Sequence, residues 1–415
     1  MTVRDEAVVD KADVGTVAPR WMTRTRGFWI VAIVFFAVMA SSAAPSPLYP
    51  VYQAQWGFGA STLTIVFAVY VFALLAALLT VGSLSDHLGR KPVVVASLLL
   101  LVASQVVFVL ADGVGWLIAA RIVQGLAAGA AMGALTAAII DLQPTDTLGP
   151  LVSSVAPAFG LGAGGIGAGL LVQFAPAPTT LVYVLIGVAL LVLTALIVAV
   201  PESAVRSGFT DRRHVVRVLT LRVGLPVSIR SRFWPVIPAL VATWSLGGFH
   251  LSLGPSIMGS VFGFRGAVVG GLDIFAMFTA GALGAASARR LRPRTAMIAG
   301  ASTLAVGIVL NVIGLHIASA PLYFVGTSVS GFGWGASFLG AMSIIGLIAP
   351  AEHRGSVFAT TLVLSYLAFS VPAIVAGVAI HSAGLLVTAT VYGSAVVTLA
   401  LGAVVTTALR SDRPA

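Results

Sequence analysis

Twelve long apolar stretches leave this chain little choice of fold. Each is about as long as the ~20 residues that an α-helix needs to cross the hydrocarbon core of a bilayer. Transmembrane β-strands would instead give segments of about ten residues with alternating polarity. The sequence therefore predicts an all-α membrane protein. The predicted spans are residues 27–49, 60–82, 92–111, 114–140, 149–172, 179–200, 234–258, 264–286, 295–316, 320–349, 356–381 and 384–409.

The shortage of charge supports the same conclusion. Only 9% of the 415 residues are Asp, Glu, Lys or Arg, whereas soluble domains carry about 25%. So few charges could not cover a water-exposed surface of this size, so the lipid bilayer is the expected solvent and partner. Cysteine is absent, which excludes a disulfide framework, a thiolate metal site and a cysteine nucleophile.

The positions of the basic residues predict the orientation. If both termini are cytoplasmic, all but two of the 23 Lys and Arg lie in the tails and the cytoplasmic loops. The exceptions are Arg265, in an outer loop, and Arg121, inside a span. This asymmetry follows the positive-inside rule and predicts a multi-pass protein of the cell (plasma) membrane. It also argues against nucleic acid as a partner, because the basic residues are spread over loops that face anionic lipid.

Connections between the spans are short except at 201–233. The predicted order is a cytoplasmic tail (1–26), a six-helix bundle (27–200), a cytoplasmic central loop (201–233), a second six-helix bundle (234–409) and a cytoplasmic tail (410–415).

A weak internal repeat relates the two bundles. A shift of 206 residues places Gly125 and Gly129 on Gly331 and Gly335, and both regions read G-x-x-x-G, an apolar run, then P-x-[DE]-x-x-G. Parallel repeats of six helices predict two bundles with a cavity between them, an arrangement that supports alternating access.

The stretch GSLSDHLGRKP, residues 82–92, concentrates charge between two apolar spans. It resembles the G-x-L-x-D-x-x-G-R-[KR] signature between helices 2 and 3 of the major facilitator superfamily, and with twelve spans and a basic central loop the resemblance covers essentially the whole chain. It implies a latch that joins the two bundles on the cytoplasmic side, against the start of helix 11 near Gly355 and Ser356. Asp86 could pair with Arg90 or cap a helix N-terminus. The alternative is a turn and topology signal without a gating role. The residues assigned to the gating motif are Gly82, Asp86, Gly89, Arg90 and Lys91.

A second match points to proton coupling. LIAARIVQGLAAGAA, residues 117–131, resembles the L-x-x-x-R-x-x-Q-G pattern of helix 4 in proton-coupled members of the superfamily. An arginine inside a span costs about 2.5–3.5 kcal/mol on insertion scales, so we expect Arg121 to face the cavity and to have a partner. The alternative is an arginine that reaches out to the membrane interface.

Helix 5 is rich in glycine. APAFGLGAGGIGAGLL, residues 156–171, resembles the G-x-x-x-G-P-x-x-G-G motif of antiporters through Gly160, Gly164 and Gly169, with Gly165 where proline is expected. The alternative is helix packing, because Gly160 with Gly164, and Gly165 with Gly169, form two faces of small residues that allow close approach.

Asp273 is the one acid deep inside a predicted span. Burial disfavours the ionised form of a carboxyl, and a carboxyl that faces alternately inward and outward can carry a proton. We therefore predict that Asp273, helped by Arg121, couples transport to a proton gradient. Two alternatives are a permanent ion pair between Asp273 and Arg121, and a position of Asp273 close to the outer surface. The first span has no acid, although many related exporters carry one there.

Polar and aromatic side chains on cavity-lining helices are the candidates for substrate contact, although each of them could instead serve packing. Asn311 is left out because helix 9 is expected to be peripheral. With so few charges in the spans, an apolar or weakly cationic solute fits better than a sugar phosphate or a dicarboxylate. The candidates are Tyr70, Gln124, Trp244, His250, Trp334 and Tyr366.

The sequence predicts a transporter and no enzyme. The six histidines lack metal-ligand spacing, and there is no GxxxxGK[ST] phosphate loop, so we predict no catalytic residue, no metal and no cofactor, with the proton gradient as energy source. The prediction is a bacterial proton-driven exporter of small hydrophobic or weakly cationic compounds, with no obligatory protein partner. The alternatives are an importer or facilitator of a neutral metabolite such as a sugar or nucleoside, and, more remotely, a membrane sensor that transports nothing.

Overall fold

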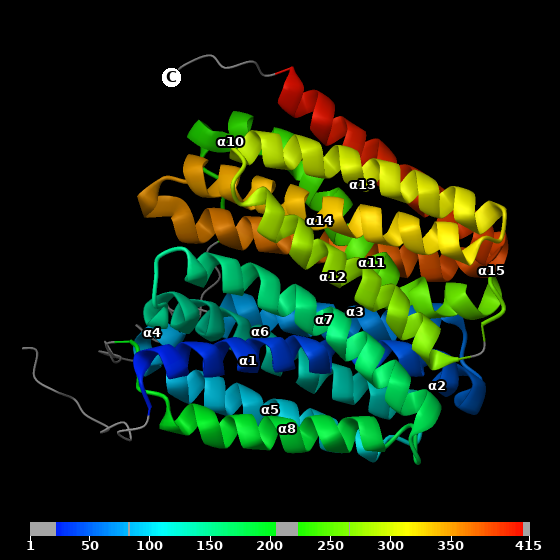
Figure 1. Ribbon diagram of the computed structural model, residues 1–415, viewed down its shortest axis with the longest axis horizontal. Helices are drawn as coiled ribbons and strands as arrows, with labels where there is room; N and C mark the ends of the chain where they lie inside the picture. The colour runs from blue at the N-terminus through cyan, green and yellow to red at the C-terminus, as the bar shows by residue number, and fades with distance from the viewer. Residues whose placement is uncertain (1–21, 82–83, 205–222, 265, 410–415) are drawn as a thin grey trace, which may run out of the picture.

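The computed structural model describes residues 22–81, 84–204, 223–264 and 266–409, with the backbone alone at positions 86 and 351. Within these ranges the chain is almost entirely helical and contains no strand, which confirms the all-α fold class (Figure 1). The elements of residues 22–204, the N-terminal half, are α1 (Arg24–Ala43), η1 (Ser46–Leu48), α2 (Tyr49–Trp56), α3 (Ala60–Val81), α4 (Leu84–Leu88), α5 (Arg90–Val109), α6 (Val114–Leu142), α7 (Leu148–Phe174) and α8 (Leu181–Ala199). Those of residues 223–409, the C-terminal half, are α10 (Val227–Phe233), η2 (Trp234–Val236), α11 (Ile237–Ser260), α12 (Ala267–Ala288), α13 (Pro293–His316), α14 (Ala320–Ile348), η3 (Ala351–His353) and α15 (Arg354–Ala408).

Eleven helices of the described residues are long and apolar enough to cross a membrane. Twelve spans were predicted, and the difference lies in α15, which has 55 residues. A helix of that length would extend about 80 Å, far more than the ~30 Å of a hydrocarbon core. It is broken at Gly384, whose φ of 76° and ψ of 164° are not helical. The break falls at the predicted boundary between the last two spans, so α15 supplies both.

The first span ends earlier than predicted because of its prolines. Helix α1 stops at Ala43, and the chain continues through η1 and α2 to Trp56. Pro45 and Pro47 have no N–H to donate to the preceding turn. A second difference is α10, a short helix inside the stretch predicted to be a loop.

The internal repeat is visible in how the two halves pack. Gly125 and Gly129 of α6 lie against the backbone of α3, at Tyr70 and Leu74. Their counterparts Gly331 and Gly335 of α14 lie against the backbone of α12, at Met277 and Gly281. The same pair of glycines therefore permits the same close helix crossing in each half.

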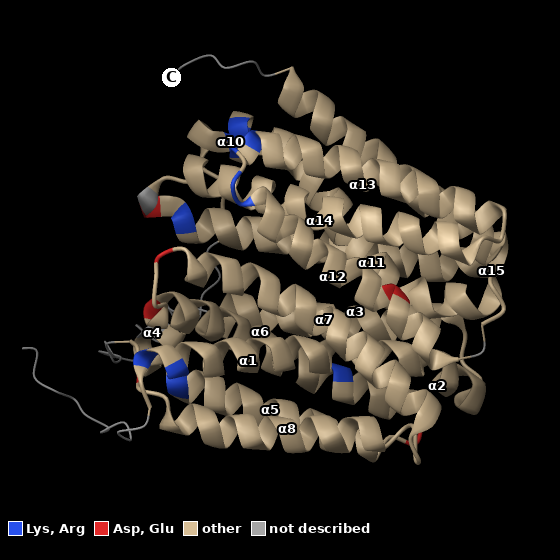
Figure 2. Cartoon of the chain, in the orientation of Figure 1, with Lys and Arg blue, Asp and Glu red and all other residues tan. Residues whose placement is uncertain are grey.

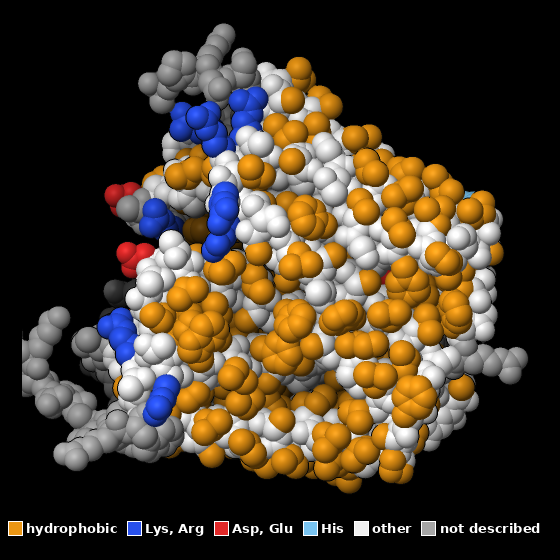
Figure 3. Space-filling model, viewed as in Figure 1, with side chains coloured by type: hydrophobic (Ala, Val, Ile, Leu, Met, Phe, Trp, Pro, Cys, Tyr) orange, Lys and Arg blue, Asp and Glu red, His pale blue; other side chains and the backbone are white. Residues whose placement is uncertain are grey.

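Positive charge gathers at one end of the helices. Every described Lys and Arg except Arg121 lies at the end where α5 and α15 begin, here called the basic end (Figure 2). Between this end and the opposite end, the outer surface carries exposed apolar side chains such as Val188 and Val192, each more than half exposed (Figure 3). A surface of this kind suits lipid and not water.

Several contacts between the described residues of the two halves lie toward the opposite end. Helix α7 packs on α12 and helix α3 packs on α15. Near the opposite end the Gln173 side chain accepts a hydrogen bond from the Val268 N–H (3.2 Å). Phe67 of α3 contacts Phe369 of α15, with ring centroids 5.3 Å apart. In addition, η1 touches α11 and α12. These contacts close the opposite end of the interface.

Candidate functional site

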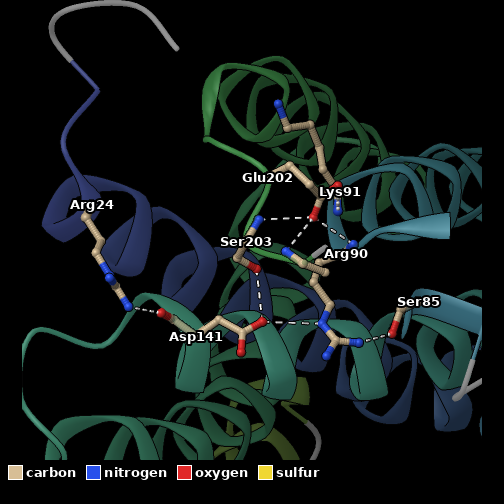
Figure 4. Close-up of polar contacts among 8 residues, drawn as sticks. Arg24, Ser85, Arg90, Lys91, Asp141, Glu202 and Ser203 are labelled. Carbon is tan, nitrogen blue, oxygen red and sulfur yellow. Dashed lines mark hydrogen bonds and ion pairs between the residues drawn. The ribbon is translucent and has the colours of Figure 1, made fainter. Parts of the chain in front are cut away.

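The loop before α5 is held by a carboxylate from the end of α8. Gly89 precedes the helix with a φ of 100°, a conformation that side chains disfavour, and it has no side chain that could cap the helix. Glu202 supplies the cap, because its two carboxylate oxygens accept the N–H groups of Arg90 (2.9 Å) and Lys91 (3.3 Å) (Figure 4). A carboxylate at a helix N-terminus is stabilised by the unpaired N–H groups and by the helix dipole.

The Arg90 side chain extends this network to α6. Its Nε lies 3.4 Å from the Asp141 carboxylate and its Nη1 donates to Ser85 (2.8 Å). Ser203 also donates to the Asp141 carboxylate (3.1 Å), and the Arg24 side chain donates to the Asp141 carbonyl (Figure 4).

These partners of the gating motif belong to the N-terminal half, together with the Val198 carbonyl that accepts from Lys91 Nζ (3.1 Å). Gly82 and the side chain of Asp86 lie outside the described residues. The latch to the region of Gly355 and Ser356 therefore stays a prediction.

Arg121 and Gln124 hold the end of α1 from inside the N-terminal half. Gln124 Nε2 donates to the Ser41 carbonyl (2.8 Å), and Arg121 Nη1 donates to the Ser42 carbonyl (3.0 Å) and to Gln124 Oε1 (2.6 Å). In a continuous helix the N–H of residue 45 would pair with the Ser41 carbonyl, but residue 45 is proline. The side chains of α6 thus satisfy the carbonyl groups that the end of α1 leaves unpaired.

Arg121 is 1% exposed and lies over two tyrosine rings. Its guanidinium carbon is 4.4 Å from the ring centroid of Tyr70 and 5.8 Å from that of Tyr49. This burial excludes the interpretation of an arginine that reaches the interface. The alternative of an Arg121–Asp273 ion pair is also wrong in this structure, because each side chain has other partners.

Asp273 lies in the core of the C-terminal half and is 0% exposed; it is the seventh residue of α12, and its depth in the membrane stays a prediction. One carboxylate oxygen is 2.9 Å from His250 Nδ1 on α11, and the other accepts from Thr327 on α14 (3.3 Å). The Asn311 amide on α13 donates to Thr327 Oγ1 (2.9 Å) and to the Tyr323 carbonyl (3.2 Å). Four helices of this half therefore meet at one buried carboxyl.

The predicted substrate residues fall into two groups. Tyr70, Gln124 and His250 belong to the buried networks around Arg121 and Asp273. Trp244, Trp334 and Tyr366 instead form a cluster of aromatic rings with Phe338 and Phe369: Trp244 lies 4.7 Å from Tyr366 and 5.9 Å from Phe338, and Trp334 stacks on Phe338 at 6.1 Å.

The aromatic cluster reaches the other half of the molecule. The Tyr366 hydroxyl lies 3.5 Å from Met132 Sδ of α6. Both tryptophans are partly exposed although they lie on inner helices, and their indole N–H groups make no hydrogen bond. The cluster therefore contacts the N-terminal half through Tyr366, and its role in substrate contact stays a prediction.

The glycines of α7 serve two different contacts. Gly160 and Gly164 lie against the α1 backbone at Phe36 and Ala40. Gly165 and Gly169 lie against α12 in the other half, and a methyl group at Gly165 would be only 2.8 Å from Ile274 Cγ2. The two small-residue faces of α7 therefore join it to its own half and to the opposite half.

Several residues of these networks are not evident from the sequence. Asp141 and Glu202 stand just after apolar spans, at the end predicted to be cytoplasmic, and this position is the one signal that could have indicated them. Asn311, set aside as peripheral, is linked to Asp273 through Thr327. Within the described residues, no three His, Asp or Glu side chains lie close enough to hold a metal ion.

Comparison with known proteins shows a family to which this sequence is similar and a solved structure with a similar fold. The family model described as Major Facilitator Superfamily matches residues 31–373. The inward-open structure of the xylose transporter XylE from E. coli superposes with a TM-score of 0.73 at 14% identity, covering 91% of this chain and 95% of that one.

Two curated relatives have names that state different roles. The 4-hydroxybenzoate transporter PcaK of Pseudomonas putida is 28% identical over 52% of this chain and 46% of its own length. The quinolone resistance protein NorA of Staphylococcus aureus is 25% identical over 49% of this chain and 51% of its own. The chain thus spans about half the length of these relatives.

Proposed function

The chain belongs to the major facilitator superfamily and is a multi-pass membrane transporter, and we propose that it exports small hydrophobic or weakly cationic compounds in exchange for protons. The observation that carries the proposal is the buried Asp273–His250 pair. A carboxyl and an imidazole that lie 2.9 Å apart and are both buried can share or exchange one proton at low cost, whereas a charged group alone at that depth would be expensive.

The proposed orientation places the basic end in the cytoplasm of the cell, with both termini on that side, because cytoplasmic loops collect Lys and Arg. The contacts between the halves then lie toward the outer end, as they would in a state that opens inward. A solute from the cytoplasm or the inner leaflet would reach the aromatic cluster of Trp244, Trp334 and Tyr366.

The proposed cycle alternates two closures. The halves rock, the loop of residues 82–92 closes the cytoplasmic side, and the solute leaves outside while Asp273 takes a proton inward. One proton that moves down a potential of 100 mV releases about 2.3 kcal/mol. In this scheme Arg121 affects proton coupling indirectly, by fixing the end of α1. The segment that follows, η1, contacts α11 and α12 of the other half.

Uptake is the second candidate, since PcaK is named as a 4-hydroxybenzoate transporter and XylE as a xylose transporter. The direction of solute flux in inside-out vesicles with an imposed pH gradient separates the two. Proton-driven accumulation in these vesicles supports export, and proton-driven accumulation in right-side-out vesicles supports import.

A panel of hydrophobic and cationic compounds tests the coupling. We expect cells that produce the wild-type protein to accumulate less of at least one compound than cells that lack it. A protonophore or Asp273→Asn should remove this difference. Asp112→Asn is the matched control, because Asp112 is an exposed acid at the opposite end. Unchanged export by Asp273→Asn would overturn proton coupling through this residue.

A further inference from the structure

Helix α12 begins at the contact between the two halves and has no cap of its own. Its N-cap residue is Gly266, which offers no side-chain oxygen to the first N–H groups of the helix. The Val269 N–H turns back to the Gly266 carbonyl (3.3 Å), whereas the Val268 N–H donates to the Gln173 side chain of α7 (3.2 Å). A side chain of the N-terminal half therefore caps a helix of the C-terminal half, and we call this contact the inter-half cap.

Close packing of α7 on α12 brings the glutamine to this position. Gly165, Gly169 and Gln173 follow each other at intervals of four residues and so share one face of α7. A Cβ atom at Gly169 would lie 2.7 Å from the Ala267 carbonyl oxygen, so the two backbones nearly touch there. One turn further along α7, Gln173 Oε1 occupies the space that a Cβ atom at Gly266 would need. Glycine on both helices thus leaves room for the amide and for little else.

The start of α7 carries a similar cap that stays within one half. Gln143 Oε1 accepts the Gly149 N–H at 3.0 Å, while the N-cap residue Thr147 makes no side-chain hydrogen bond to the helix. Gln143 and Gly149 are six residues apart in the sequence, whereas Gln173 and Val268 are 95 apart. The two glutamines make the same kind of contact, but that of Gln173 alone joins different halves.

The inter-half cap lies at the opposite end, where the halves must separate when that end opens. Separation of α7 from α12 takes Gln173 away from the Val268 N–H and leaves this group to water. Loss of a side-chain cap changes an equilibrium constant by about 2- to 30-fold. Gln173 is exposed, so we expect a value in the lower part of this range.

We propose that Gln173 sets the balance between the two states of the transporter, because it caps α12 only while the opposite end is closed. The inference rests on the proposed function, since it assumes that the halves alternate. The cap favours the state that opens at the basic end, which is the state that receives a solute from that side. Neither a glutamine amide nor a backbone N–H ionises near neutral pH, so this bias should not depend on pH.

Spin labels on the full-length protein test this role. The chain has no cysteine, so Leu110→Cys at the end of α5 and Ile317→Cys at the end of α13 place one label on each half at the opposite end. Both residues are more than half exposed. Pulsed electron spin resonance in lipid nanodiscs then gives the distance between the labels and the ratio of open to closed molecules. We expect Gln173→Ala to raise this ratio about fivefold.

Gln143→Ala is the matched control, because it removes the same side chain from a cap within one half. It should leave the ratio unchanged even if it lowers the melting temperature. Gln173→Glu keeps an acceptor, and a carboxylate is favoured at a helix N-terminus, so its ratio should be no higher than that of the wild type. A ratio raised as far as in Gln173→Ala would contradict the cap.

A double variant separates the link between the halves from the stability of α12. Gly266 has extended torsion angles, with φ of −89° and ψ of 135°, which suit a serine N-cap. Gln173→Ala with Gly266→Ser therefore gives α12 its own cap without a link to α7, and the raised ratio should persist. A return to the wild-type ratio would overturn the proposal, since the effect would then come from helix stability alone.

The remaining outcomes distinguish this inference from the proposed function. A wild-type ratio in Gln173→Ala would overturn the role of Gln173 and leave the transport cycle intact. A single label distance that no solute, pH or variant changes would overturn alternating access itself, and the role of Gln173 with it.

Discussion

At the scale of single residues, proline and glutamine form a complementary pair across two helices. Pro45 has helical torsion angles, with φ of −67° and ψ of −21°, so α1 loses its hydrogen bond there through the missing N–H alone. Gln124 supplies the donor to Ser41 that the backbone lacks. The end of α1 is therefore fixed by a side chain of α6.

This pairing gives a prediction about two substitutions. Gln124→Leu should lower the free energy of unfolding by about 1–3 kcal/mol, because it leaves the Ser41 carbonyl buried without a donor. Pro45→Ala restores a backbone N–H at the same place and should recover most of that loss in the double variant. Thermal unfolding of the four purified proteins measures both effects. Losses that simply add in the double variant would contradict this role of Gln124.

Residue-scale networks were also the part that the sequence predicted least. Asp273 and Arg121 stood out because charge inside a span is rare, yet their partners did not. His250, Thr327 and Asn311 come from three different helices, and only the packed bundle brings them to one carboxyl. Glu202 caps α5 from more than a hundred residues away, a contact that no local pattern encodes.

At the scale of elements, the helices could be predicted well from the sequence because each must cross a bilayer. The predicted spans agree with the helices to within a few residues, because apolar length is set by membrane thickness. The exceptions have local causes. Three prolines between residues 45 and 50 break the first span, and the final two spans follow each other so closely that one glycine separates them.

That glycine, Gly384, should not tolerate a side chain. Its φ of 76° with ψ of 164° is accessible almost only to glycine, so Gly384→Ala should cost about 1–3 kcal/mol of stability. Gly402 lies on the same helix with ordinary helical torsions and open space around it, so Gly402→Ala should be neutral or slightly stabilising. Melting temperatures of the two variants make the comparison. Equal effects would show that the break does not depend on the glycine conformation.

At the scale of the whole molecule, the two halves can be tied together at a defined place. A Cβ atom at Gly162 of α7 would lie 3.1 Å from Thr279 Oγ1 of α12, which is within the reach of disulfide geometry. The chain has no cysteine of its own, so Gly162→Cys with Thr279→Cys introduces a single possible bridge.

We expect oxidation of this double variant to stop transport and reduction to restore it, because alternating access requires α7 and α12 to separate. Transport of a substrate identified in the compound panel, measured before and after a reductant, checks the result. Each single-cysteine variant serves as the control and should transport under both conditions. Full transport by the oxidised, cross-linked protein would show that this interface does not open during the cycle.

Asp273 and Ile274 are neighbours in sequence, but their side chains face different halves of the molecule. The carboxyl belongs to the inner network of its own half, whereas Ile274 meets Gly165 across the seam. If a change of charge at Asp273 rotates α12, Ile274 must move against α7. In the proposed cycle, protonation of Asp273 and movement of the halves would therefore be linked directly, because Asp273 and Ile274 are joined by one peptide bond.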